Sequence, residues 1–341
     1  MQRHFRLGGG VAPKTTRLRG QSIIEYVLII AVIGLVIVFA GPGVAGAIRN
    51  QFGNATNTLA SGTHGGGFTG SGGSSGGGAG SNAPNQDQIK YLESMKPVTE
   101  KEAKDWTLAD QQLAAEDIAK RGTASVAFPK AREAMDAGTK WTITLTNGQA
   151  LEYKIIGIKH DDLADGNGKA GLTFLTTSMT ISSRMNPTAT SVGGWEKSEL
   201  RAKMNSGEIW NLMPSEFQSK AKAVKKLTNN VGGGSENKNA AVTATSDKLF
   251  LLSYSEIVPT SYWASSYPWT SSEGTQYEAF QGKVTNNHSG NECLKTGHLW
   301  WERSVNPRNS THFLYVNTCG DPSSIYGTAT SSLCVCPAFS F

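Results

Sequence analysis

Residues 141–158 have the sequence WTITLTNGQALEYKIIGI, and this stretch indicates how the folded part of the chain is built. Apolar and polar residues alternate from Trp141 to Leu145 and again from Leu151 to Ile155. Alternation with a period of two is typical of strands that bury one face. The Asn147-Gly148 pair between the two segments is a strong hairpin signal and predicts a type I′ turn. The stretch therefore predicts two antiparallel strands.

The other elements expected around this hairpin are short and of both kinds. Thr99 and Glu102 have the spacing of a capping box, which predicts a helix that includes Trp106. Residues 198–213 have a loosely helical period. Apolar segments predict further strands at 248–253, 312–316 and 333–341. Few helices, several short strands and long irregular segments predict an α+β domain.

Charge is distributed unevenly along the chain. The sequence has 32 basic and 27 acidic residues, a net charge of +5. The first 20 residues contain five Lys or Arg and no acid, which leaves 27 basic and 27 acidic residues in 21–341. The excess positive charge therefore belongs to a basic leader. Nucleic-acid binding calls for a clustered basic surface on a folded domain, so no nucleic-acid partner is expected.

An apolar run of 26 residues, Ile23 to Ile48, follows the leader and contains one charged residue, Glu25. As a helix it would be about 39 Å long, enough to cross a bilayer core of ~30 Å. Basic residues precede it, which predicts a cytoplasmic N-terminus and export of the rest of the chain. Three interpretations compete: a signal peptide cut near residues 45–47, an uncleaved anchor, and a pilin-type segment.

Gly20-Gln21-Ser22-Ile23-Ile24-Glu25-Tyr26, followed by the apolar run, resembles the processing site of Flp-type (type IVb) pilins. The resemblance covers about residues 17–60. It implies that a prepilin peptidase removes residues 1–20, and that residues 21–60 form a transmembrane and assembly helix. Gly20, Gln21, Glu25 and Tyr26 are then the processing residues. The implied partners are the peptidase, the membrane and other pilin subunits.

Glu25 needs an explanation, because an acid within a membrane segment is costly unless it is paired. Cleavage after Gly20 would create an ammonium on Gln21. In a filament, the carboxylate of Glu25 in one subunit can pair with that ammonium in its neighbour. The alternative is that Glu25 extends toward the membrane surface, since it lies close to the leader.

Residues 61–87 connect this N-terminal part to the folded part. Residues 61–80 alone contain 11 Gly and 4 Ser, a composition typical of a flexible linker. The remaining 88–341 are long enough to bury a core of their own and are expected to form an extracellular head.

Several segments of the head resemble a lectin-like module of unknown function, found in exported proteins of Gram-positive gut bacteria. The matching segments are 155–171, 193–195, 247–253, 300–304 and 337–341. The resemblance spans about 106–341 and implies a fold similar to C-type lectins. Members often have Gly-Val-Arg-Pro near the end, where this chain has Cys334-Val335-Cys336-Pro337.

Ligand-binding candidates in the head are aromatic, basic and polar residues. Trp300, Trp301 and Arg303 form one possible platform, because aromatic faces stack on sugars and cations. The alternative, which is the favoured interpretation, is that one or both tryptophans belong to the core and Arg303 is a buried structural ion. Asn309 and Tyr326 lie in or near polar loops, where binding residues concentrate.

A metal site is weighed at the acidic, glycine-rich segment that contains Asp162, Asp165 and Asn167. The EF-hand pattern fails, because its first and twelfth ligand positions would be Leu163 and Phe174. A turn held by Asp and Asn side chains is the favoured interpretation, with an unusual calcium site as the alternative. No cofactor is expected.

All four cysteines lie after residue 290, and an even number in an exported segment predicts disulfides. On one strand, Cys334 and Cys336 would point the same way and would be poorly placed to bridge each other. Each is therefore expected to pair with one of Cys293 and Cys319, and both pairings remain open.

These observations predict a pilin-like surface subunit that carries an adhesin head, as a minor or tip pilin. It would occupy the membrane as a precursor and then the cell surface or pilus, and would bind an extracellular glycan or protein. One alternative is a secreted or anchored lectin-like protein outside any pilus, and another is a tethered enzyme. Catalysis is not expected, because the serine-hydrolase, zinc-protease and Walker motifs do not occur in the sequence.

Overall fold

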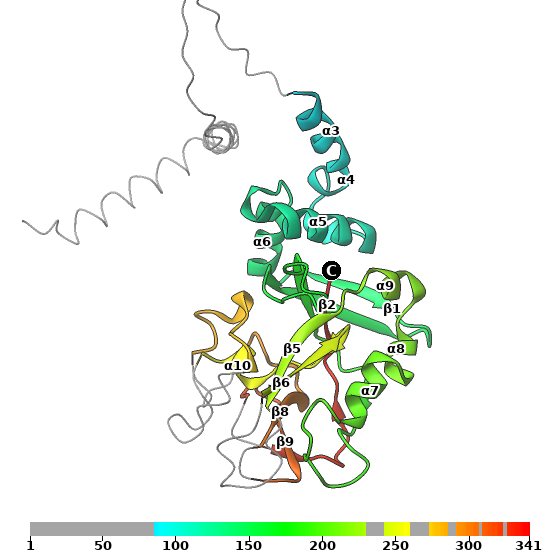
Figure 1. The fold of residues 1–341 in the computed structure, drawn as a ribbon, viewed down its shortest axis with the longest axis vertical. Helices are drawn as coiled ribbons and strands as arrows, with labels where there is room; N and C mark the ends of the chain where they lie inside the picture. The colour runs from blue at the N-terminus through cyan, green and yellow to red at the C-terminus, as the bar shows by residue number, and fades with distance from the viewer. Residues whose placement is uncertain (1–84, 230–241, 260–272, 286–290, 307–308, 323–325) are drawn as a thin grey trace, which may run out of the picture. The chain divides into compact units, whose positions relative to one another are not determined.

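The computed structural model describes residues 85–229, 242–259, 273–285, 291–306, 309–322 and 326–341 (Figure 1). The chain divides into two units, Met1–Ser81 and Asn82–Phe341, and all described residues belong to the second. The expected leader, the assembly helix and nearly all of the linker lie outside the described residues, as do Gly20, Gln21, Glu25 and Tyr26. Within the described ranges, no helix has both the length and the apolar character needed to cross a bilayer.

Among the described residues, four α-helices precede the first strand: α3 (Gln86–Ser94), α4 (Lys96–Thr99), α5 (Leu108–Arg121) and α6 (Phe128–Ala137). The capping box expected at Thr99 is wrong, because Thr99 ends α4. The box belongs to α5, where the Thr107 side chain accepts a hydrogen bond from the Asp110 amide and the Asp110 carboxylate accepts one from the Thr107 amide. Short 3₁₀ helices, η1 (Ala103–Asp105) and η2 (Gly122–Ala124), flank α5.

The first sheet has the strand order β1 (Lys140–Thr144), β2 (Ala150–Ile158), β3 (Leu172–Thr176), β12 (Ala338–Ser340) and β7 (Leu249–Phe250). All its pairings are antiparallel. The predicted hairpin is confirmed by β1 and β2, but the turn is not type I′. Gly148 has φ 82°, whereas Asn147 does not have the positive φ that type I′ requires. The Leu145 carbonyl accepts a hydrogen bond from the Gly148 amide, and the Leu145 amide donates one to the Gln149 carbonyl. This pattern fits a three-residue hairpin loop.

The second sheet has the order β10 (Tyr326–Thr328), β9 (His312–Val316), β8 (Trp300–Val305), β11 (Leu333–Cys334) and β4 (Ser182–Ser183). β9 confirms the strand expected at 312–316. β8 has a bulge where it pairs with β9. Trp301 pairs with Tyr315 and Val305 with Phe313, so residues 302–304 of β8 stand opposite the single residue 314 of β9. A separate ribbon pairs β5 (Val224–Asn229) with β6 (Val242–Asp247).

The remaining described helices are short: α7 (Glu199–Asn205), α8 (Glu208–Leu212), α9 (Ser215–Lys220), α10 (Tyr254–Ile257) and η5 (Glu278–Phe280). The single helix expected at 198–213 is therefore two helices that meet at Gly207. A Cβ at Gly207 would lie 2.9 Å from the Lys203 Cα, so the chain turns back too tightly for any other residue.

The C-terminal strand expected at 333–341 is also divided. β11 belongs to the second sheet and β12 to the first, with Pro337, which has no amide hydrogen to donate, between them. The segment therefore joins the two sheets. The argument that placed Cys334 and Cys336 on one face of a strand fails, because the strand ends at Cys334. In the structure Cys293, Cys319, Cys334 and Cys336 are free cysteines, so the two expected disulfides are absent from the described residues.

The core beside the first sheet is aromatic, and it surrounds the C-terminus. Phe339 stacks on Phe174 with ring centroids 5.1 Å apart, and Phe217 meets Phe339 edge to face at 4.7 Å. The Phe341 amide and carbonyl both bond to the start of β3. Helix α5 packs so closely here that a Cβ at Gly171 would overlap the Ala115 carbonyl. Figure 1 shows the C-terminus ending beneath α5, beside β2.

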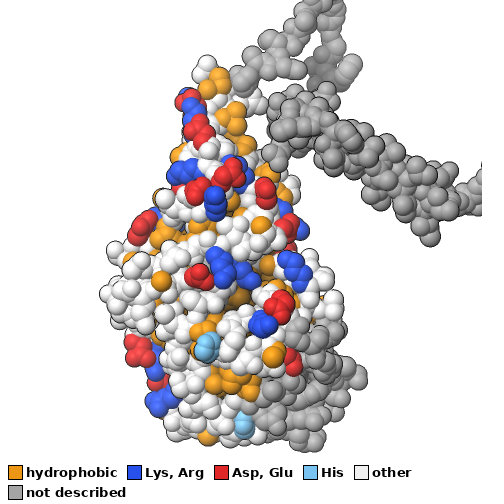
Figure 2. All heavy atoms as spheres, turned by 180° about the vertical axis from the view of Figure 1, so that it is seen from behind, with side chains coloured by type: hydrophobic (Ala, Val, Ile, Leu, Met, Phe, Trp, Pro, Cys, Tyr) orange, Lys and Arg blue, Asp and Glu red, His pale blue; other side chains and the backbone are white. Residues whose placement is uncertain are grey.

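This architecture corrects the fold class expected from the sequence, a pilin helix with a C-type-lectin-like head. The described residues form a mixed α/β fold with two five-stranded sheets and a two-stranded ribbon, and it is not recognisably lectin-like. The segments that carried the resemblance contain large core side chains, such as Trp195 and Trp300, which pack inside many folds. On the face in Figure 2, basic and acidic side chains lie beside one another rather than in one patch of a single sign.

Candidate functional site

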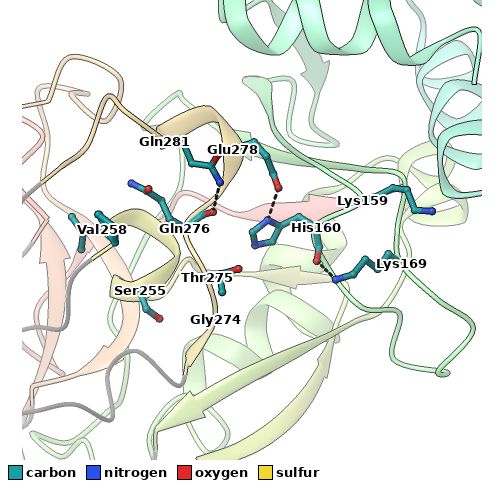
Figure 3. A pocket seen from close by; sticks show the side chains of 11 residues that line it. Lys159, His160, Lys169, Ser255, Val258, Gly274, Thr275, Gln276, Glu278 and Gln281 are labelled. Carbon is teal, nitrogen blue, oxygen red and sulfur yellow. Dashed lines mark hydrogen bonds and ion pairs between the residues drawn. The ribbon is translucent and has the colours of Figure 1, made fainter. Parts of the chain in front are cut away.

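A hollow of about 480 Å³ opens beside the end of β2. Lys159, His160 and Lys169 form one wall, and Ser255 with Val258 belongs to the segment around α10. The rest of the lining comes from Pro259, Gly274, Thr275, Gln276, Glu278 and Gln281. Figure 3 shows the His160 imidazole and the Glu278 carboxylate facing one another across part of this space.

His160 is held in place by a turn and by two side chains. Lys159, just before it, has φ 52°, so the chain leaves β2 through a left-handed residue. The imidazole stacks on the Tyr277 ring with centroids 4.0 Å apart, and its Nδ1 lies 3.2 Å from Glu278 Oε1. Gly157 leaves room for this stack, because a Cβ there would lie 2.8 Å from the Tyr277 ring.

The protonated form of His160 is favoured in the folded protein. Burial by itself lowers the pKa of an imidazole, but the hydrogen bond to Glu278 and the charges of Asp161 and Glu278 outweigh it. The pKa of His160 is therefore raised above 6.5. Its contribution to stability is present below pH 6.5 and is lost as the pH rises through the raised pKa.

Beneath the hollow, Tyr277 connects His160 to a buried ion pair. The Tyr277 hydroxyl lies 3.0 Å and 2.9 Å from the two carboxylate oxygens of Asp161. Lys226 Nζ lies 2.6 Å from Asp161 Oδ1 and 3.0 Å from the Tyr277 oxygen. Burial alone would raise the pKa of Asp161, but Lys226 and His160 hold it below its usual value.

The ion pair continues into a four-member network. Lys226 Nζ also lies 2.5 Å from Glu256 Oε1, and Arg303 Nη1 lies 2.5 Å from Glu256 Oε2. Asp161, Lys226, Glu256 and Arg303 thus form a continuous chain with alternating charges that sum to zero. Arg303 also donates to the carbonyls of Leu227, Leu251 and Glu273. The guanidinium therefore ties β5, β7 and β8 to the floor of the hollow.

Two further buried carboxyl groups adjoin this network. Glu273 accepts hydrogen bonds from the Asn229 amide and the Ser304 hydroxyl, and burial raises its pKa to about 7. Glu302 is fully buried, and neither of its carboxyl oxygens has a hydrogen-bond partner among the described residues. Burial and the nearby Glu273 raise the pKa of Glu302 well above its usual value.

The charged lining of the hollow is mainly basic. Lys159, Lys169 and His160, whose pKa is raised, line the hollow together with one carboxylate, Glu278. Lys169 Nζ donates to the His160 carbonyl at 2.7 Å and pairs with Asp162 at 3.0 Å, which fixes its position. Among the described lining residues, no hydroxyl or thiol contacts the imidazole, and the Ser255 hydroxyl bonds to that of Ser253. The arrangement suits recognition of an anionic group.

The ligand platform expected at β8 is not accessible. Trp300 is 1% exposed, and Trp301 and Arg303 are 0% exposed. The Trp300 indole donates to the Leu294 carbonyl and the Trp301 indole to the Ser183 carbonyl, so both polar edges are used internally. These residues have the structural roles that the sequence analysis offered as the alternative, with Arg303 as a buried ion.

The other two ligand candidates lie apart from the hollow's lining. Asn309 is half-buried, and its side-chain oxygen accepts hydrogen bonds from the Thr311 amide and hydroxyl, so it stabilises its own turn. Tyr326 begins β10, where its backbone is opposite Leu314. Neither is among the residues that line the hollow.

The acidic segment behaves as a turn. The Asp165 carboxylate accepts a hydrogen bond from the Asn167 amide at 3.0 Å, and Asp162 pairs with Lys169. Within the described ranges, no three His, Cys, Asp or Glu side chains are grouped so that they could hold a metal ion.

Sequence reasoning missed His160, Tyr277 and Glu278 as a site. His160 and Asp161 occur inside the quoted segment 155–171, so a polar pair directly after a buried strand was the available signal. Tyr277 and Glu278 lie more than 110 residues later. Their sequence context carries no motif, and only folding brings them to His160.

The described residues form a mixed α/β domain built around a buried ion network. A family model described as a domain of unknown function (DUF6273) matches residues 170–341, about half of the chain. The chain belongs to this family. Lys226, Glu256 and Arg303 lie within the matched region, and His160 and Asp161 precede it. No curated protein and no solved structure matches the chain.

Proposed function

We propose that this chain is a pilin-type surface subunit, matured by cleavage after Gly20, whose head binds an extracellular ligand. Export and maturation are supported by the basic leader, the apolar run 23–48 and the Gly/Ser-rich residues 61–80. Binding is supported by one observation above all, the hollow in which Glu278 holds the His160 imidazole above a buried ion network. The bulk of the head favours a minor or tip subunit, present at the membrane as a precursor and then at the cell surface.

The lining of the hollow favours a ligand that carries a carboxylate, such as an acidic saccharide on a glycan or glycoprotein. Lys159, Lys169 and protonated His160 supply positive charge, and Thr275 supplies a hydroxyl. The Tyr277 stack and the Glu278 bond hold the imidazole rigidly, so little ordering entropy is lost on binding.

Replacing His160 by glutamine is expected to weaken binding of carboxylated glycans by about tenfold, because a charge-assisted hydrogen bond is lost. For the unmodified protein, binding should also weaken as the pH rises above 6.5 and through the raised pKa of His160. The measurement is binding of the full-length protein to an array of neutral and carboxylated saccharides at several pH values.

The matched control for this prediction is His298→Gln, because His298 is exposed and is not part of the hollow's lining. It should leave both the affinity and its pH dependence unchanged. Equal retention of carboxylated glycans by the His160→Gln variant and the unmodified protein would count against the hollow as the binding site.

Assembly gives a separate prediction at Glu25. The Glu25→Gln variant should be cleaved normally but should be at least about tenfold depleted from sheared filaments, because the neighbour's Gln21 ammonium loses its partner. The measurement is the ratio of filament-bound to cell-bound protein. Glu100→Gln, a change in the described head, is the control and should assemble normally. Unmodified levels of Glu25→Gln in filaments would show that the pairing is not needed.

A further inference from the structure

A second hollow, of about 140 Å³, lies beside β1, β2 and β3 and shares no lining residue with the first. Lys140 and Lys154 contribute from β1 and β2, and Thr176 from β3. The opposite side comes from the turn at 292–296 together with Trp300 and Cys336. The hollow is therefore formed by segments far apart in the sequence.

Lys154 is a largely buried cation without a matching anion. Its Nζ donates a hydrogen bond to the Cys293 carbonyl at 2.9 Å, and no carboxylate of the described residues lies within ion-pair distance of it. Lys140 stands directly opposite Lys154 in the strand register, and like charges in such pairs repel. Burial and the charges of Lys140 and Lys283 lower the pKa of Lys154. A buried ammonium in such a place calls for a counter-ion.

Two threonines that line the hollow have hydroxyl groups without a partner. Thr176 Oγ1 and Thr177 Oγ1 are buried and make no hydrogen bond to any described residue. Thr176 stands opposite Tyr153 and faces the core side of the sheet, whereas Thr177 lies two positions after Leu175, the residue opposite Lys154, and so shares the face of Lys154. Buried hydroxyls in proteins are nearly always hydrogen-bonded, so the Thr177 donor is available to a bound group.

We propose that this hollow binds a small oxyanion, with Lys154 as its principal cation and Thr177 as a hydroxyl donor. An oxyanion supplies the charge that Lys154 lacks and an acceptor for the Thr177 hydroxyl in one group. Lys140 and Lys295 stand at the rim, but each is already paired with an exposed carboxylate, Glu152 and Glu292. The uncompensated positive charge is therefore that of Lys154. The sulfate, phosphate or carboxylate of a larger molecule would be recognised by the same groups.

The test is calorimetric titration of the full-length chain, in neutral detergent, with sodium sulfate, sodium phosphate and sodium acetate. Sodium chloride at equal ionic strength is the reference. At least one oxyanion should bind measurably better than chloride, and the preferred one distinguishes a tetrahedral anion from a carboxylate. Lys154→Met should weaken that binding by at least about tenfold, and Thr177→Val by about threefold.

Lys225→Met is the matched control, since Lys225 is exposed and lies outside both hollows. His160→Gln should also leave oxyanion binding unchanged, which separates this site from the first. Thr177→Val keeps the side-chain shape, so it decides the matter if Lys154→Met fails to fold. Equal affinity for chloride and the three oxyanions would overturn the proposal, as would unweakened binding by both the Lys154 and Thr177 variants.

Discussion

Replacing Arg303 by methionine is expected to lower the free energy of unfolding by about 3–5 kcal/mol, because removing one partner of a buried pair leaves an uncompensated charge. Arg303 is fully buried and bonds to both Glu256 oxygens, at 2.5 Å and 3.0 Å. Its loss leaves the carboxylates of Asp161 and Glu256 with only Lys226. It also leaves the carbonyls of Leu227, Leu251 and Glu273 without the guanidinium donor.

Urea unfolding of the variants would measure this effect. Arg303→Lys keeps the charge but cannot reproduce the planar five-donor group, so it should recover only part of the lost stability. Arg132→Met breaks the exposed pair with Asp136, whose side chains are 50% and 55% exposed, and should cost less than about 1 kcal/mol. A cost for Arg303→Met as small as that of Arg132→Met would show that the network does not hold the fold together.

Replacing Gly20 by valine is expected to stop maturation, so that the full-length precursor accumulates. The expectation rests on the resemblance to Flp-type pilins, in which the peptidase cuts after a glycine. A branched side chain at that position would obstruct the bond to be cut. Mass spectrometry of the N-terminus measures the outcome, since normal processing produces a chain that begins at Gln21.

Gly10→Val is the matched control, because Gly10 lies within the leader but ten residues from the proposed cut. This variant should mature normally. If Gly20→Val also produced a chain beginning at Gln21, the proposed processing site would be wrong. A mature protein that begins near residue 48 would instead indicate an ordinary signal peptide.

The sequence by itself determined those elements whose signals are local. The hairpin at 141–158 and the strand at 312–316 were predicted correctly, because alternation and turn residues act within a few positions. Errors arose where a neighbour in space decides the outcome. The segment 333–341 looks like one strand, but β11 pairs with β8 and β4 while β12 pairs with β3 and β7.

The candidate sites depended on tertiary structure almost completely. Asp161, Lys226, Glu256 and Arg303 come from four segments spread over more than 140 residues, and none of them belongs to a local motif that predicts an ion network. Burial in the fold then decided the role of individual residues. Trp300 and Trp301, weighed as a binding surface, are core, whereas Lys154, which no motif singles out, is a cation without a counter-ion among the described residues. The sequence specifies the chemistry of each side chain, but the fold sets the surroundings of that side chain and therefore its role.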